Sequence, residues 1–151
     1  GAATKIDYPS LSNADSTMFE GKGLLAYRTA DMHWQAGLGY AYDKGSDRRP
    51  GRDRSGVSGL LVGRVLLPHN SIGEISWNRQ NWQGKEVYSP GLIEQIRSQD
   101  TRVLRAALIY PITREHAVHL EYRDVRNHEN ISLFAYQGRS WQLSWQWQPG
   151  K

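Results

Sequence analysis

Trp141-Gln142-Leu143-Ser144-Trp145-Gln146-Trp147 alternates strictly between apolar and polar side chains, and this stretch decides the fold. Successive side chains of a β-strand point to opposite faces, so every second residue lies on the same face. Three tryptophans and Leu143 would therefore share one face, and only glutamine and serine would occupy the other. This alternation predicts a strand that separates an apolar phase from water.

The same alternation recurs upstream and predicts an all-β fold of antiparallel strands. The strands are expected at residues 19–28, 34–42, 57–67, 72–82, 103–110, 117–123 and 141–147. The alternation is less clean in 57–67, which is apolar on both faces, and in 72–82, which is polar on both. The side chains expected to face lipid are Phe19, Leu25, Trp34, Leu38, Tyr40, Leu108, Tyr110, Leu120, Tyr122, Trp141, Leu143, Trp145 and Trp147.

The connections between these strands alternate in length. Short turns at 30–32, 68–71 and 112–115 alternate with long polar links at 43–55, 83–100 and 124–139. Outer-membrane barrels alternate short periplasmic turns with longer outer loops in this way, so we expect an antiparallel transmembrane β-barrel.

The strand count bears on how much of a barrel this chain supplies. Seven strands are visible, or eight if 4–11 adds one, although Pro9 makes that segment a poor spanning strand. Single-chain bacterial barrels have even strand numbers, which favours the C-terminal part of a larger barrel over an eight-stranded one. We divide the chain into an irregular N-terminal segment (1–16), barrel strands (17–148) and a tail (149–151).

Composition excludes several classes of protein. Hydrophobic residues make up 38% and form no run of the ~20 residues that a spanning helix needs. Tryptophan (6) and tyrosine (8) outnumber phenylalanine (2), as expected for side chains at a membrane boundary. The absence of cysteine excludes disulfides and thiolate metal sites. The net charge is +4, but the basic residues are scattered along the chain and form no single stripe, which argues against a nucleic-acid partner. The first residues lack the features of a signal peptide, so we expect a mature, trimmed or fragmentary chain.

Three segments together resemble a known family. They are Tyr40-Ala41-Tyr42-Asp43 with 47–54, Tyr88-Ser89-Pro90-Gly91-Leu92 with Arg97, and Leu120-Glu121-Tyr122-Arg123 with Asn127, Asn130, Ile131, Leu133, Phe134 and Tyr136. This order is similar to that in the C-terminal barrels of surface lipoprotein assembly modifiers and related tetratricopeptide-repeat outer-membrane proteins. The resemblance implies a Gram-negative outer-membrane barrel that exports or displays a polysaccharide or lipoprotein. The chain departs from the family in lacking a preceding helical repeat and in continuing past Trp147.

Charged side chains on the polar faces are the first candidate site. They are Arg28, Arg64, Glu74, Arg105, His119, Glu121 and Arg123. Inside a barrel such groups could line an export path, because rings of charge control what passes through a pore. The alternative, which we favour for any single residue, is a salt-bridge network in an ordinary polar lumen.

Four arginines form a second candidate site in the first long link. Arg48, Arg49, Arg52 and Arg54 could bind lipid phosphates or an anionic polymer through charge-assisted hydrogen bonds. Equally, they could belong to a solvated loop in which nearby aspartates offset part of the charge.

Catalysis and metal binding have little support. His119 and Glu121 could form a hydrolase site with Ser132 or Ser140, but no nucleophile motif accompanies them. A His-x-Glu pair also lacks a third metal ligand. We therefore predict no enzyme, no metal and no cofactor.

The predicted function is a porin-like outer-membrane barrel that contacts membrane lipid and takes part in export or surface display. One alternative is a soluble, tryptophan-rich β-sandwich that binds carbohydrate, which would bury the tryptophans between two sheets. Another is a small eight-stranded barrel acting as an anchor or as a lipid-modifying enzyme.

Overall fold

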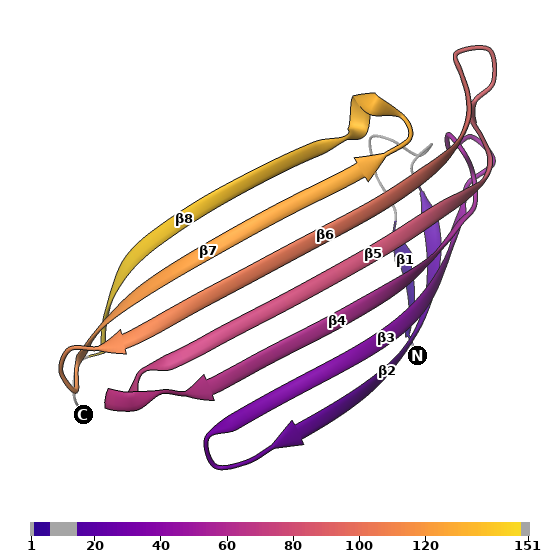
Figure 1. Cartoon of the computed structure of the whole chain (residues 1–151). Coiled ribbons are helices and arrows are strands. Elements are labelled where there is room, and N and C mark those ends of the chain that lie inside the picture. Colours follow the sequence, from indigo (N-terminus) through magenta and orange to yellow (C-terminus); the bar gives the residue numbers. More distant parts are fainter. Residues whose placement is uncertain (1, 7–14, 149–151) are drawn as a thin grey trace.

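The computed structural model describes residues 2–6 and 15–148, which form one antiparallel sheet in which each strand pairs with the next along the chain (Figure 1). The strands are β1 (Ala2–Ile6), β2 (Ser16–Arg28), β3 (Met32–Gly45), β4 (Arg54–Leu66), β5 (Ile72–Ser89), β6 (Ile93–Pro111), β7 (His116–Glu129) and β8 (Tyr136–Trp147). Two short 3-10 turns, η2 (Pro68–Asn70) and η3 (Ser132–Phe134), lie in connections. The predicted all-β antiparallel fold is confirmed.

All seven predicted strands are present, but most extend further than the alternation suggested. The links expected at 83–100 and 124–139 are largely wrong, because β5 and β6 continue as a hairpin to a turn at Pro90–Leu92 and β7 continues to Glu129. Backbone pairing needs no apolar face, so a ladder can continue where the side chains become polar on both sides. The segment 1–16, expected to be irregular, contains β1, while 7–14 and the tail 149–151 lie outside the described residues.

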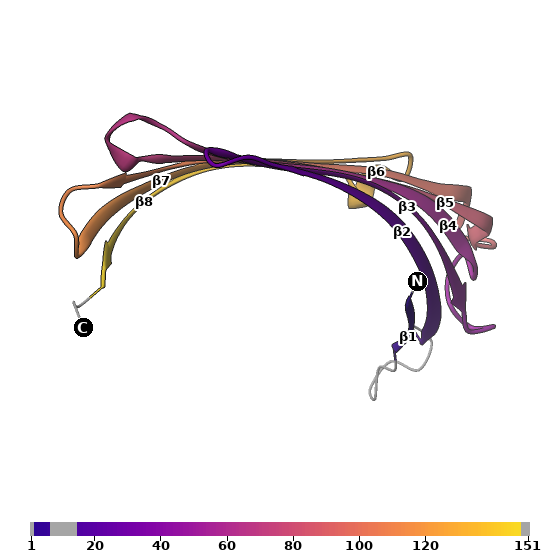
Figure 2. The same ribbon diagram turned by 90° about the horizontal axis from the view of Figure 1, so that it is seen from below.

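The sheet is bent into an open arch (Figure 2). Strands β1 and β8 are the two ends of the strand order and do not pair with each other, so the sheet is not closed into a barrel. The observed fold is therefore an open, curved sheet, and closure of the predicted barrel is not seen in the described residues. No helix in this part of the chain is long and apolar enough to cross a membrane.

The two faces of the arch differ in crowding. The polar face contains buried Ala41, Ala107 and Asn127, whereas Leu25 and Leu143 on the apolar face are 79% and 73% exposed. Side chains converge on the inner side of a bent sheet and diverge on the outer side, so the polar face is concave and the apolar face convex. The described residues form a single sheet, with no second layer over either face.

A cross-strand pair of tryptophan and glycine shapes the convex face. Trp34 is paired with Gly63, and a Cβ added to that glycine would lie 2.4 Å from the Trp34 ring. The indole can therefore lie against the backbone of β4 only because position 63 has no side chain. Pairs of this kind help to fix strand register, since an aromatic ring covers the exposed glycine backbone.

Candidate functional site

The convex face carries a continuous apolar surface from β2 to β8, which we call the apolar belt. It consists of Leu25, Tyr27, Trp34, Leu38, Tyr40, Val57, Leu61, Ile75, Trp77, Leu104, Leu108, Tyr110, Leu120, Tyr122, Trp141, Leu143, Trp145 and Trp147. Strand register places every side chain predicted to face lipid on this one face. Its aromatic side chains also contact one another, with the rings of Tyr122 and Trp141 4.7 Å apart.

Exposure of the belt is greatest on the last strand. Trp141, Leu143 and Trp145 are 70%, 73% and 61% exposed, although each is large and apolar. Soluble proteins rarely expose a connected apolar surface of this extent. No other element of residues 2–6 and 15–148 covers the belt.

The concave face holds a chain of ion pairs across four neighbouring strands, which we call the ion ladder (Arg64, Glu74, Arg105 and Glu121). Glu74 accepts from Arg105 at 3.3 Å and lies 3.7 Å from Arg64, while Arg105 Nε donates to Glu121 at 2.8 Å. The charges alternate from β4 to β7, so each carboxylate faces a guanidinium. This arrangement brings together four of the predicted lumen residues and favours the structural, salt-bridge interpretation for them.

The side chains of the other two predicted lumen arginines are unpaired among the described residues. Arg28 ends β2 and Arg123 lies on the concave face of β7, and both are exposed. Among the described residues, neither side chain makes a hydrogen bond or an ion pair. They are the cations of the predicted set that remain available to a solute along the concave face.

His119 lies at the end of the ion ladder. Its Nε2 is 3.9 Å from Glu121 Oε2, and its Nδ1 is 3.5 Å from Ser144 Oγ. The sequence-based candidates Ser132 and Ser140 do not contact it; Ser144, the serine that does, could have been found from its place on the polar face of the last strand. This 3.5 Å distance is longer than the about 2.6–3.2 Å typical of a serine activated by a histidine base.

The predicted arginine loop is largely held by its own carboxylates. Asp43 accepts hydrogen bonds from Arg49 at 2.9 Å and from Arg54 at 2.8 Å, and its side chain is only 3% exposed. Burial raises the pKa of Asp43, but the two arginines outweigh this effect and the pKa lies below its ordinary value. Arg52 pairs with Asp47 and, at 3.5 Å, with Glu86. Three of the four arginines of this loop therefore pair with carboxylates of the chain itself.

A pocket of about 260 Å³ lies where this loop meets the ends of β5 and β6, and we call it the loop-end pocket. Its lining includes Arg49, Arg52, Arg54, Trp82, Tyr88 and Arg97. Arg54 stacks over Trp82 at 4.7 Å, and Arg49 Nη1 is buried without a hydrogen-bond partner. A pocket of cations and aromatic faces suits an anionic or sugar-like group. Arg48 is exposed and lies outside this lining.

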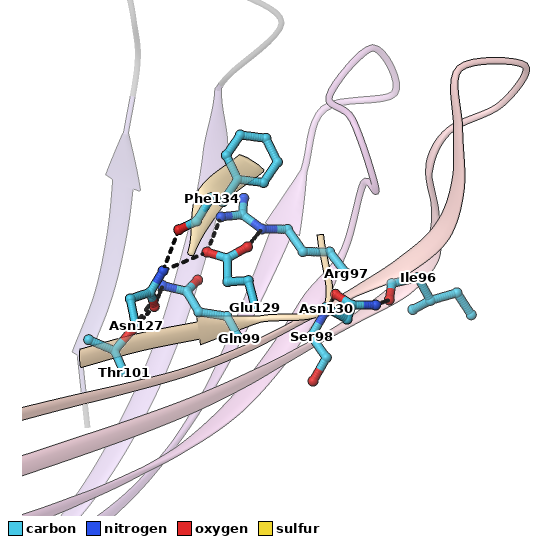
Figure 3. Close-up of polar contacts among 9 residues, drawn as sticks. All are labelled: Ile96, Arg97, Ser98, Gln99, Thr101, Asn127, Glu129, Asn130 and Phe134. Atoms are coloured by element: carbon cyan, nitrogen blue, oxygen red, sulfur yellow. Dashed lines mark hydrogen bonds and ion pairs between the residues drawn. The ribbon is translucent and has the colours of Figure 1, made fainter. Parts of the chain in front are cut away.

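A polar network beside the pocket fixes the connection between β7 and β8 (Figure 3). Arg97 donates two hydrogen bonds to Glu129, at 2.7 and 2.8 Å, and its guanidinium stacks on Phe134 at 4.5 Å. Asn127 donates to Glu129 and to the Phe134 carbonyl, and accepts from Thr101. These contacts hold η3 against the ends of β6 and β7.

Glu129 is the buried anion of this network, with a side chain 1% exposed. Burial raises the pKa of Glu129, but the hydrogen bonds from Arg97 and Asn127 lower it by more than burial raises it. The pKa therefore lies below its ordinary value. Sequence reasoning noted Arg97 and Asn127 as part of a resemblance but gave them no role. Their partner Glu129 follows the apolar part of β7, where alternation no longer identifies the inward face.

No group of His, Cys, Asp and Glu in the described part of the chain is arranged to hold a metal ion. No protein-family model, no curated protein and no solved structure matches the chain. Functional inference therefore depends on the geometry of the two faces.

Proposed function

We propose that this chain forms part of the wall of an outer-membrane β-barrel, with the apolar belt in lipid and the concave face toward an aqueous lumen. The observation that carries the proposal is the exposed belt, which includes five of the six tryptophans, Trp34, Trp77, Trp141, Trp145 and Trp147. Transmembrane barrels alternate apolar and polar side chains in this way and have aromatic girdles at the membrane surfaces.

The two faces are separated only by the thickness of the sheet. Leu104 belongs to the belt, and its neighbour Arg105 belongs to the ion ladder on the opposite face. A charged ladder directly behind an apolar surface suits a wall with hydrocarbon on one side and water on the other. On the convex face of β3, apolar side chains extend over nine residues, from Trp34 to Tyr42, which matches the ~9–11 residues of a tilted spanning strand.

A soluble carbohydrate-binding sandwich is the main competing proposal. In that fold the apolar face of the sheet packs against a second sheet, and the tryptophans are buried. Here the tryptophans of β8 lie on the outer side of the arch and are exposed. In our proposal, further strands complete the barrel by pairing with the free edges of the sheet.

The role we assign to this wall is passage or surface display of a polysaccharide or lipoprotein. The loop-end pocket supports it, since its arginines and aromatic rings suit an anionic or sugar-containing chain. The family resemblance of the loop sequences points to the same role.

A matched pair of charge substitutions on β8 tests the membrane proposal. Leu143→Arg places a charge on the belt, and Gln142→Arg places the same charge on the concave face one residue away. We expect Leu143→Arg to lower the free energy of unfolding in phosphocholine vesicles by ~2–4 kcal/mol, and Gln142→Arg to change it little. Urea titration followed by tryptophan fluorescence provides the measurement.

The unaltered chain should also require detergent or lipid to remain monodisperse and β-rich. Monodisperse, β-rich protein in plain buffer would contradict the proposal, and so would equal effects of the two substitutions.

A further inference from the structure

A row of arginines crosses the convex face on the loop side of the apolar belt. We call Arg79, Arg102, Arg126 and Arg139 the arginine row. Arg79 is directly paired with Arg102, and Arg102 with Arg126, so three guanidinium groups stand side by side on β5, β6 and β7. Like charges directly opposite each other destabilise a sheet, so such a row needs anions nearby.

Two aspartates supply part of the compensating charge from within the row. Asp100 accepts hydrogen bonds from Arg79 at 2.9 Å and from Arg102 at 2.7 Å. Asp124 accepts from Arg126 at 2.9 Å and lies 3.9 Å from Arg139. Hydrogen bonds from the arginines lower the pKa of Asp100 despite its partial burial. Four cations against two anions leave two positive charges uncompensated in this group.

The aspartates also orient the arginines. Arg79, Arg102 and Arg126 each use Nε and Nη2 to bind a carboxylate, and Nη1 of each guanidinium has no hydrogen-bond partner within the described part of the chain. The arginine side chains of the row are 44–68% exposed, whereas those of Asp100 and Asp124 are 18% and 13% exposed. The carboxylates therefore lie beneath the guanidinium groups, and unused N–H donors face outward.

The row borders the apolar belt directly. Three members of the row have a belt residue two positions away on the same strand and face. These neighbours are Trp77 for Arg79, Leu104 for Arg102 and Trp141 for Arg139. An amphiphile whose chains lie on the belt would place its headgroup at the row. Outward-facing guanidinium groups with free donors match the oxygen atoms of a phosphate.

We propose that the arginine row binds the phosphate of phosphorylated lipids at the membrane surface. This inference rests on the proposed function, because it requires the belt to lie in lipid. The row then fixes the depth of the sheet in the membrane and gathers phosphorylated lipid around the loop side of the wall.

Lipid competition measured by tryptophan fluorescence tests this inference. The chain is refolded into vesicles of brominated phosphatidylcholine, which quenches belt tryptophans, and unbrominated phosphatidic acid then competes for the protein surface. We expect phosphatidic acid to displace the brominated lipid more effectively than unbrominated phosphatidylcholine does. In Arg102→Gln/Arg126→Gln this preference should fall roughly 30-fold.

Arg114→Gln is the matched control, because Arg114 is an exposed arginine in the turn at the other end of the sheet. It should retain the preference. Arg139→Gln is a second test variant that keeps both aspartates paired with another arginine, and it should lose part of the preference even if the double variant folds poorly.

The outcomes separate this inference from the proposed function. Absence of quenching by brominated phosphatidylcholine would show that the belt does not meet lipid, and both proposals would fail. Normal quenching with no preference for phosphatidic acid, or equal loss in Arg114→Gln, would overturn the arginine row alone. Loss of the preference in millimolar inorganic phosphate would overturn the lipid as ligand and indicate a site for the free anion.

Discussion

At the scale of single residues, the structure depends on a few polar groups that the alternating pattern does not mark. Glu129 is almost completely enclosed, and Arg97 and Asn127 supply its hydrogen bonds. Removing one partner of a buried pair costs more than removing an exposed charge, because the remaining group stays desolvated. The loop end of the sheet should therefore be sensitive to this carboxylate.

Glu129→Gln should lower the free energy of unfolding by roughly 1–3 kcal/mol at pH 7. Glu94→Gln is the matched control, since Glu94 lies on an exposed part of β6 without a described partner, and it should have almost no effect. Urea unfolding of the detergent-solubilised chain measures both. Equal effects would show that the Glu129 network does not stabilise the fold.

The same comparison predicts a pH dependence. The pKa of Glu129 is lower in the folded chain than its ordinary value of 4.5, so its contribution is complete above that value. The contribution is lost as the pH falls through the lower, folded-state pKa. Acidification below pH 4 should therefore reduce the difference in stability between the unaltered chain and Glu129→Gln. A difference that grows on acidification would contradict this assignment.

Gly63 tests how closely tryptophan approaches the backbone of β4. Gly63→Ala places a Cβ 2.4 Å from the Trp34 ring, so the ring must move, and we expect a loss of roughly 1–3 kcal/mol. Gly59→Ala, on the same face and strand, meets only an ordinary 3.5 Å contact with Trp77 and should be neutral or slightly stabilising. The free energies of unfolding of the two variants, measured by urea titration, decide between these outcomes.

At the scale of the element, each long strand has a spanning part and a polar extension. In β6, Leu104, Leu108 and Tyr110 belong to the belt, whereas on the same face Arg102 belongs to the arginine row and Asp100 accepts its hydrogen bonds. Strand register places the change from apolar to charged side chains at the same level in β5 and β6, where Trp77 is paired with Leu104 and Arg79 with Arg102. Pairing continues through both parts, which explains why apolar alternation predicted strands shorter than those observed.

Single cysteines on β8 provide a direct test of the two faces, because the chain has no cysteine of its own. In lipid vesicles, Gln142→Cys and Ser144→Cys should react with a water-soluble maleimide, while Leu143→Cys and Trp145→Cys should be protected. In denaturant all four should react equally, which is the control for intrinsic reactivity. Labelling without a period of two in vesicles would contradict the orientation we propose for β8.

At the scale of the whole molecule, the sheet has two free edges. β1 pairs with β2 only from Ser16 to Glu20, so the described part of β2 from Lys22 to Arg28 has one partner strand, as does the whole of β8. Free edges present unpaired backbone groups, which cannot remain unsatisfied in hydrocarbon. The open arch therefore requires additional strands when it lies in a membrane.

Hydrogen exchange of the chain in detergent should reveal these edges. Amides of β4, β5 and β6, which have partners on both sides, should exchange slowest. In β8 the amides that point toward β7 should be protected, and the alternate ones should exchange at least tenfold faster. Uniform protection along β8 would show that its outer edge is paired, either by another copy or by closure of the sheet.

The amino-acid sequence by itself determined the strands and their two faces. Side chains on a pleated strand must alternate, so the apolar and polar positions of Trp141–Trp147 and its counterparts identify each face before any contact is known. It also identified the charged residues of the concave face, since Arg64, Glu74, Arg105 and Glu121 occupy polar positions of their strands. Where both faces become polar, alternation carries no information, and the strand ends were missed.

Only the tertiary structure decided which charges meet. Arg79, Arg102 and Arg126 are separated by more than twenty residues along the chain, and only the register of β5, β6 and β7 aligns them in one row. The pairing of Arg97 with Glu129 and the open form of the arch depend in the same way on strand register and curvature. Register depends on how the patterns of neighbouring strands and the turn between them fit together, so the pattern of one strand does not specify it alone.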